Sequence, residues 1–359
     1  MFRVLPIILT LLIAAPLGAA EPDVLVGAYY FSGWWEEQPN KYTTSHIDWR
    51  DHYPGRIATL GEYNDQPTMN REIRAAADHS VHFFQFLWYF QGRKTVEEHQ
   101  DKLNAGINLF ISSPDNDRLH FTVEFVNQPP FGIYEDKDWE ASCREWVKLM
   151  NHPRYLRLGG KPVFKIHSLD AFRQQNASDN AKVASRLKKL RDIAKSQNAG
   201  DLIISAGVMT AAVPKPDDCE MYDFLTTYMD VPNLRPSVHP YPYKDLIAQA
   251  QNGWKLYGEK SSKPYVPCVP VGWDPRPWKD TRPSFSEPTD DEWFAALASV
   301  KHAMDKSPNL AIPISPGRSQ KMILIYAWNE FGEGGILAPT QGNRSMPLHI
   351  LKRAFPPEE

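Results

Sequence analysis

Cysteine is scarce in this chain of 359 residues, which carries only Cys143, Cys219 and Cys268. Three cysteines permit at most one disulfide and leave one thiol over, so the sequence is not that of a small scaffold stapled by cystines. The 11 histidines are scattered, and neither an HExxH motif nor a cysteine-pair motif occurs. Because the common metal-site patterns are missing, we predict that the protein uses no metal and no other cofactor.

A strong charge of either sign is also lacking. The formal net charge is -3, charged residues make up 23% of the chain, and the two signs are interspersed. This pattern does not indicate a nucleic-acid partner. The patterns GxGxxG, GxxxxGK[ST] and GxSxG are absent from the predicted strand-to-helix junctions. Neither nucleotide binding nor serine-nucleophile chemistry is therefore indicated.

Long apolar runs are absent beyond the N-terminus. Residues 4–17 form one apolar run, preceded by Arg3 and followed by small residues up to Ala20. This pattern predicts a secretory signal peptide over residues 1–20 with cleavage after Ala20, and an uncleaved anchor is the alternative. We expect a secreted or periplasmic mature chain, residues 21–359, that does not insert stably into a membrane.

Short apolar runs alternate with longer amphipathic segments, which is typical of a parallel sheet wrapped by helices. Strands are predicted at residues 24–31, 81–90, 119–126, 162–167, 202–208, 224–228, 265–271 and 322–328. Helices are predicted at residues 70–79, 95–111, 177–197, 246–254 and 293–304, and from about Trp139. Eight strands with intervening helices predict the α/β class, a (β/α)8 TIM barrel in a single domain, rather than an open doubly wound sheet.

The chain is rich in aromatic residues, with 11 Trp and 15 Tyr. Most such side chains belong to protein cores, but their flat apolar faces also suit the stacking of sugar rings. Active sites of TIM barrels form at the C-terminal ends of the strands, so residues there are the candidates. The predicted substrate-binding residues are Tyr29, Tyr30, Trp35, Trp88, Tyr89, Glu124, Asn127, Tyr228, Trp273, Asp274, Arg276, Trp328 and Asn329.

Glu330 and Glu333 follow the last predicted strand and enter a turn rich in glycine. Cleavage of a glycosidic bond commonly needs two acidic groups, one to protonate the leaving oxygen and one to act as base or nucleophile. We predict these glutamates as the catalytic pair, although an Asn-Glu pair that only caps a helix has the same spacing. Glu124 lies within an apolar strand, so it either meets a buried partner or faces the site. Asp274 would equally form an ion pair with Arg276.

Several strings of the sequence resemble a known family. The string IYAWNEFGEGGILAP at residues 325–339 resembles the signature of glycoside hydrolase family 99 and its WbsX-like relatives. The strings VGAYYFSGWW at 26–35, GKPVF at 160–164 and GWDPRP at 272–277 are similar to WbsX-like strings. The string FTVEF at 121–125 is similar to the FHIEP element of the hydrolases. The resemblance covers nearly the whole mature chain, and its terminal motif is the specific part.

The resemblance implies a (β/α)8 barrel with a retaining, metal-independent activity like that of endo-α-mannosidases. It implies that Glu330 deprotonates the sugar 2-hydroxyl to give a 1,2-anhydro intermediate, that Glu333 is the general acid/base, and that Glu124 binds substrate. Four positions depart from the family pattern and change the implied sugar contacts: Phe331 and Gly332 replace Trp and His, Ala338 replaces the glutamate of the IEP element, and Thr122 replaces the histidine of FHIEP.

We therefore predict a secreted glycoside hydrolase that cleaves α-linked glycans or polysaccharide, so that its partner is a carbohydrate substrate. One alternative is a glycosyltransferase of polysaccharide biosynthesis, a label that WbsX-like proteins also carry. An exported chain without a visible nucleotide-phosphate loop argues against it, because sugar nucleotides are chiefly cytoplasmic. The other alternative is a noncatalytic carbohydrate-binding barrel, since aromatic platforms and carboxylates also serve recognition.

Overall fold

Parallel strands form the centre of the protein, whose computed structural model describes residues 22–92, 100–209, 211–235 and 237–357. The predicted signal peptide lies outside these residues. The barrel strands are β1 (Val24–Tyr30), β4 (Phe83–Tyr89), β5 (His120–Val126), β7 (Lys161–Ile166), β8 (Ile203–Gly207), β9 (Phe224–Thr226), β10 (Tyr265–Val266), β11 (Cys268–Pro270) and β13 (Arg318–Tyr326). Their order is β10-β9-β8-β7-β5-β4-β1-β13-β11. All eight predicted strands are present, and the predicted barrel is confirmed.

The seventh predicted strand is divided in two at Pro267. Its first half, β10, pairs with β9, and its second half, β11, pairs with β13, so one segment closes the barrel. Proline has no N–H group to donate to a strand ladder. Its carbonyl still accepts from the N–H of Leu324 at 2.9 Å. Closure brings the C-terminal ends of all these strands to one end of the barrel.

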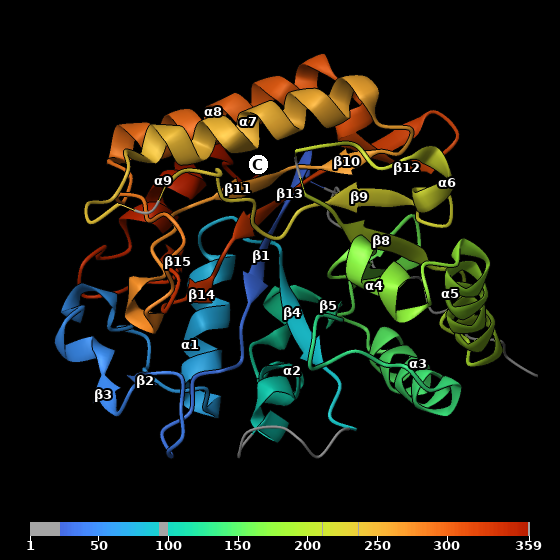
Figure 1. The fold of residues 1–359 in the computed structure, drawn as a ribbon, viewed down its shortest axis with the longest axis horizontal. Coiled ribbons are helices and arrows are strands. Elements are labelled where there is room, and N and C mark those ends of the chain that lie inside the picture. Colours follow the sequence, from blue (N-terminus) through green and yellow to red (C-terminus); the bar gives the residue numbers. More distant parts are fainter. Residues whose placement is uncertain (1–21, 93–99, 210, 236, 358–359) are drawn as a thin grey trace, which may run out of the picture.

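Helices cover the outside of the barrel (Figure 1). They are α1 (Gln66–Ala77), α2 (Ala105–Ser112), α3 (Asp136–Met150), α4 (Leu169–Gln175), α5 (Asn180–Ser196), α6 (Pro216–Cys219), α7 (Tyr243–Lys260), α8 (Asp290–Lys306) and α9 (Met346–Ala354). Figure 1 shows α7 and α8 side by side along one flank. The predicted helix at 95–111 is shorter than expected, because α2 follows a 3-10 turn, Gln100–Asn104, and residues 95–99 lie outside the described part. The short helices α4, α6 and α9 carry too few turns for the periodicity to predict them.

The core accounts for most of the aromatic residues. Every residue of β1 and β4 is buried, because one face of each strand fills the barrel and the other packs against helices. The three cysteines, Cys143, Cys219 and Cys268, are buried free thiols, so stability comes from this core rather than from disulfides. No helix among the described residues is both long and apolar enough to cross a membrane.

Four short antiparallel strand pairs are present in addition to the parallel strands among the described residues. β12 (Ala311–Ser315) pairs with the start of β13, and β6 (Arg157–Leu158) pairs with β7. β2 (Thr43–Thr44) pairs with β3 (Ile47–Asp48) in the long connection between β1 and α1. β14 (Asn329–Glu330) and β15 (Gly335–Ile336) form a hairpin directly after β13. This last hairpin carries both predicted catalytic glutamates at the C-terminal end of the barrel.

Candidate active site

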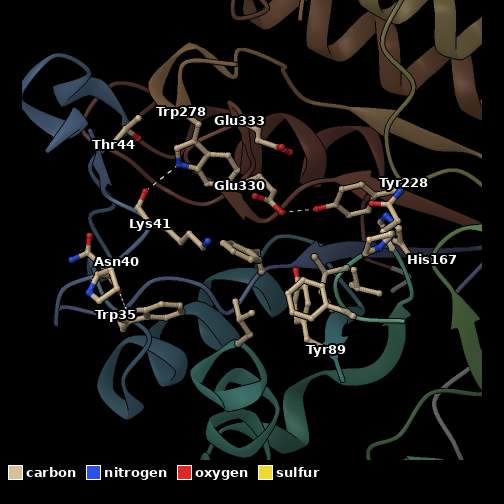
Figure 2. A pocket seen from close by; sticks show the side chains of 18 of the residues that line it. Trp35, Asn40, Lys41, Thr44, Tyr89, His167, Tyr228, Trp278, Glu330 and Glu333 are labelled. Carbon is tan, nitrogen blue, oxygen red and sulfur yellow. Dashed lines mark hydrogen bonds between the residues drawn. The ribbon is translucent and has the colours of Figure 1, made fainter. Parts of the chain in front are cut away.

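A cavity of about 600 Å³, called the main cavity below, lies where the barrel strands end (Figure 2). Its volume is typical of a small-molecule site. Five of the predicted site residues line it, namely Trp35, Tyr89, Tyr228, Glu330 and Glu333. They come from segments that follow or end β1, β4, β9 and β13. Barrel closure therefore brings together side chains that lie far apart in the sequence.

Glu330 lines the main cavity and accepts a hydrogen bond from a tyrosine. The hydroxyl of Tyr228 donates to Glu330 Oε1 at 2.5 Å, as Figure 2 shows. Glu330 is only 4% exposed, and its Oε2 has no hydrogen-bond partner among the described residues. A buried carboxylate oxygen without a donor is costly. This oxygen would therefore gain stability from a hydrogen-bond donor.

Glu333 lies one turn further along the same hairpin. Its N–H donates to Glu330 O at 3.1 Å, which fixes the spacing of the two residues. Its Oε2 accepts from the Tyr326 hydroxyl, and its Oε1 lies 3.6 Å from Arg282 Nη2. Glu333 also lines an adjoining cavity of about 360 Å³, which shares His167 and Tyr228 with the main cavity. Glu333 thus stands where the two cavities meet.

Burial raises the pKa of both carboxyl groups, and the nearby charge of Glu333 contributes to raising that of Glu330 well above its ordinary value. The hydrogen bonds from Tyr228 and Tyr326 and the charge of Arg282 lower these pKa values in part. Two carboxylates this close resist ionising together. The pair therefore retains a proton at a pH where exposed glutamates are fully ionised.

Two glycines allow the turn between the glutamates to pack tightly. A Cβ on Gly332 would lie 2.1 Å from the ring of Trp278, so only glycine leaves room for this indole in the cavity wall. Gly334 has φ +78, and a Cβ there would lie 2.8 Å from the backbone nitrogen of Asp274. A glycine adopts this conformation without strain.

None of the four departures from the family pattern is among the described residues that line the main cavity.

Aromatic rings form the walls of the main cavity. Trp35 Nε1 donates to Pro39 O at 2.8 Å, and Trp278 Nε1 donates to Lys41 O at 3.1 Å. These bonds fix the two indoles, and in the view of Figure 2 Trp278 lies beside the carboxylates while Trp35 and Tyr89 lie below them. Rigid aromatic faces beside carboxylates suit a ligand that has both apolar faces and hydroxyl groups.

A buried ion pair lies below the main cavity. Lys165 Nζ donates to Glu124 Oε1 at 2.9 Å and to the Tyr29 hydroxyl at 2.7 Å, and Gln85 Nε2 donates to Glu124 Oε2 at 2.6 Å. Burial raises the pKa of Glu124, but the charge of Lys165 and the hydrogen bond from His167 outweigh it and lower the pKa to about 2. Glu124 therefore meets a buried partner, the first of its two predicted alternatives. His167 lines the main cavity and also forms a hydrogen bond with Glu124, so it connects the cavity with the buried ion pair.

Strand alternation separates residues that the sequence places together. Neighbouring residues of a strand point to opposite faces. Tyr29 points into the barrel below the main cavity, whereas Tyr30 points to α1 and donates to Glu72 Oε2 at 2.6 Å. Trp88 packs against α3, whereas Tyr89 lines the main cavity. The structure thus places Tyr30 and Trp88 on the helix side, away from the cavity.

Three further predicted residues form hydrogen bonds around the site, two of them with the backbone. Asn127 exchanges hydrogen bonds with the backbone of Ser168 at 2.9 and 2.8 Å. Asn329 does the same with Phe31, with both bonds at 2.9 Å. Trp328 Nε1 donates to a carboxylate of α1 at 3.0 Å. Asn127 and Asn329 thus hold segments next to lining residues, and none of the three is among the described residues that line the main cavity.

Trp273, Asp274 and Arg276 lie behind the turn that carries Glu333. They line a rear cavity of about 400 Å³, to which Gly334 also contributes. Arg276 Nε lies 2.6 Å from Asp274 Oδ1, so the ion pair anticipated from the sequence is present. Trp273 also lines the adjoining cavity. The structure does not bring these three residues into the main cavity.

Five residues of the site were not among the predicted site residues: Lys41, His167, Trp278, Arg282 and Tyr326. Figure 2 shows the side chain of Lys41 reaching into the main cavity, and its charge lowers the pKa of Glu330. Lys41 belongs to a long connection that carries no motif, so no sequence signal identified it. His167 and Trp278 had weak signals, since one closes the fourth strand and the other follows the GWDPRP string.

Comparisons with known proteins agree with this architecture. Residues 40–351 match the family model described as Glycosyltransferase WbsX. No curated protein matches the chain. Two structures of the GH99 endo-α-mannosidase from Bacteroides thetaiotaomicron align with TM-score 0.55 over 93% of this chain. One, in complex with bis-tris-propane, is 16% identical and covered over 98% of its length, and the other is 13% identical and covered over 99%.

A third similar structure is a GH5_18 variant from Streptomyces cattleya in complex with Manβ1-4GlcNAc. Its TM-score is 0.51 and its identity 11%, with 93% of this chain and 82% of that chain covered. At these identities the likeness establishes the barrel fold.

Proposed function

The chain belongs to the WbsX family, and on this premise we propose that it is a glycan-active enzyme, a retaining glycoside hydrolase that cleaves α-linked glycans or polysaccharide. The observation that carries the proposal is the buried pair Glu330 and Glu333 in an aromatic cavity, with both pKa values raised by burial. Glycosidic cleavage uses such a pair, in which one carboxyl stays protonated beside another that acts as base or nucleophile.

We assign Glu330 the role of the base. A sugar hydroxyl in the main cavity would donate to its buried Oε2, which has no partner among the described residues. Such a bond favours the ionised carboxylate. The proton of the pair would then reside on Glu333, which borders the adjoining cavity and acts as general acid toward the leaving oxygen.

The resemblance to family 99 supplies the sequence of bond changes. Glu330 takes the proton of the 2-hydroxyl, and the freed oxygen attacks the anomeric carbon to give a 1,2-anhydro sugar while Glu333 protonates the leaving oxygen. Glu333 then takes a proton from the water that opens this ring. As the ring opens, Glu330 returns its proton to the 2-oxygen of the sugar. Both carboxyl groups are then in their starting protonation states.

The aromatic walls are proposed as platforms for sugar rings. Trp35, Trp278 and Tyr89 line the main cavity together with the carboxylates, and the indole nitrogens are fixed by backbone carbonyls. Trp278 occupies the space next to Gly332, the position where the family pattern has a histidine. We propose that this exchange gives the site different sugar contacts from those of the α-mannosidases.

Reducing-end release tests the proposal. The mature protein is incubated with a panel of α-mannans and of bacterial and algal polysaccharides, beside the Glu333→Gln variant. We expect new reducing ends from the wild type, and for Glu333→Gln a loss of activity on substrates with poor leaving groups while binding remains. If Glu333→Gln cleaves these substrates as fast as the wild type, Glu333 is not the general acid.

The family description favours a second candidate, a glycosyltransferase that uses the same residues. It predicts that a sugar nucleotide binds in calorimetry, which the hydrolase proposal does not. A noncatalytic barrel instead predicts polysaccharide binding without new reducing ends on any glycan of the panel.

Export of the chain is part of the proposal, supported by the apolar run at residues 4–17 and the small residues before Glu21. Expression in a bacterial host followed by N-terminal sequencing of the exported protein tests it. We expect Glu21 as the first residue. A retained Met1 would refute cleavage.

A further inference from the structure

A buried arginine holds the turn of Glu333 from behind. Arg56, which is 7% exposed, donates through Nη1 to Phe331 O at 3.2 Å and to Asp274 O at 2.9 Å. Its Nη2 lies 2.5 Å from Asp274 Oδ2. The N–H of Asp274 in turn donates to Glu333 O at 2.6 Å. The carbonyl oxygens of Phe331 and Glu333 thus both accept hydrogen bonds from the Arg56–Asp274 ion pair.

This ion pair is itself firmly anchored. Three backbone hydrogen bonds tie residues 55–59 to residues 339–342, which follow β15. Arg276 Nε lies 2.6 Å from the other Asp274 oxygen, Oδ1. A Cβ on Gly334 would lie 3.3 Å from Arg56 Nη2, so the arginine packs directly against the turn. The contact therefore joins three segments, namely the connection after β1, the loop after β11 and the β14–β15 hairpin.

We propose that Arg56 and Asp274 are positioning residues that fix the Glu333 carboxyl relative to Glu330 without touching the substrate. Neither residue is among the described residues that line the main cavity. Both act on backbone atoms of the hairpin, whose conformation sets the direction of the Glu333 side chain. Misplacing a catalytic group by about 1 Å costs about 100-fold in rate. This inference rests on the proposed catalytic role of Glu333.

The test compares Arg56→Lys with a matched control, Arg186→Lys. Lysine keeps the positive charge but has a single nitrogen, so it cannot hold two carbonyls and a carboxylate in the same fork geometry. Arg186 is also buried, and it donates to Ile133 O at 2.7 Å and to Tyr134 O at 2.5 Å. Both variants lose the same kind of contact, but only one of them lies behind Glu333.

Two readouts are measured for each variant and the wild type. The first is kcat and KM on a substrate found in the glycan panel. The second is the titration of the glutamate carboxyls by NMR with 13C-labelled glutamate, with the Glu333 signal identified by its absence in Glu333→Gln. The titration needs no substrate, so it tests positioning even if the proposed hydrolase activity is absent.

We expect Arg56→Lys to lower kcat by about 10- to 100-fold with little change in KM. We also expect the Glu333 titration to move to lower pH, because a loosened turn admits water and relieves the burial that raises its pKa. Arg186→Lys should leave both readouts at wild-type values. Wild-type titration of Glu333 in Arg56→Lys would overturn the proposal, and so would an equal shift in both variants.

Discussion

The hydroxyl of Tyr228 is the only donor to Glu330 Oε1 that the described residues show, at 2.5 Å, so Tyr228→Phe isolates one contact of the proposed base. The substitution leaves both oxygens of a buried carboxylate without a donor. Because the bond stabilises the ionised form, its loss raises the pKa of Glu330 further. A base works only when it is ionised, so the acidic limb of the pH–rate profile moves to higher pH.

The size of the shift follows from the charge on the acceptor. A hydrogen bond to a charged group contributes about 1.5–3 kcal/mol. One pH unit corresponds to about 1.36 kcal/mol, so the limb moves by about one to two units. On the acidic side of the optimum, kcat/KM then falls by about 10- to 100-fold. The measurement is kcat/KM from pH 4 to 9, which reports the free enzyme.

Tyr243→Phe is the matched control. Tyr243 is also buried, and its hydroxyl donates to Pro270 O at 2.8 Å, outside the lining of the main cavity. It should lose about 1 kcal/mol of unfolding free energy without moving the pH profile. If the Tyr228→Phe profile coincides with that of the wild type, Glu330 is not the base.

Three further outcomes are expected. Lys165→Met removes the lysine partner of the buried Glu124 carboxylate, and urea unfolding should show a loss of about 3–5 kcal/mol. Gly334→Ala forces alanine into φ +78 against Asp274, and should cost more than about 1 kcal/mol in the same assay. Glu330→Gln should unfold at a higher temperature than the wild type at pH 8 and at a similar one at pH 5. The raised pKa means that the folded state loses stability as pH rises through ionisation, which glutamine avoids.

Periodicity predicted most of the fold. Strands buried on both faces read as continuous apolar runs, and all eight were found at the predicted places. The division of the seventh strand at Pro267 was missed, because a proline in a short run does not reveal that its two halves pair with different neighbours. The short helices and the β14–β15 hairpin were missed because they contain too few residues to show a periodic pattern.

The site was predicted unevenly. Position at the ends of the strands placed Trp35, Tyr89 and Tyr228 in the cavity wall, but it could not separate them from Tyr30 and Trp88. Strand ends are short and irregular, so which face a terminal side chain takes depends on where the last ladder hydrogen bond forms. That information lies in the pairing register, which is a property of the whole barrel.

The sequence by itself determined the barrel, the place of Glu330 and Glu333 after its last strand, and the family resemblance, because these depend on local composition and order. Only the tertiary structure decided the surroundings of these carboxyls. Burial, the hydroxyl of Tyr228 and the reach of Lys41 into the cavity come from segments far apart in the chain. The pKa of a carboxyl responds to the groups that surround it in space, so its chemistry is fixed when the barrel closes.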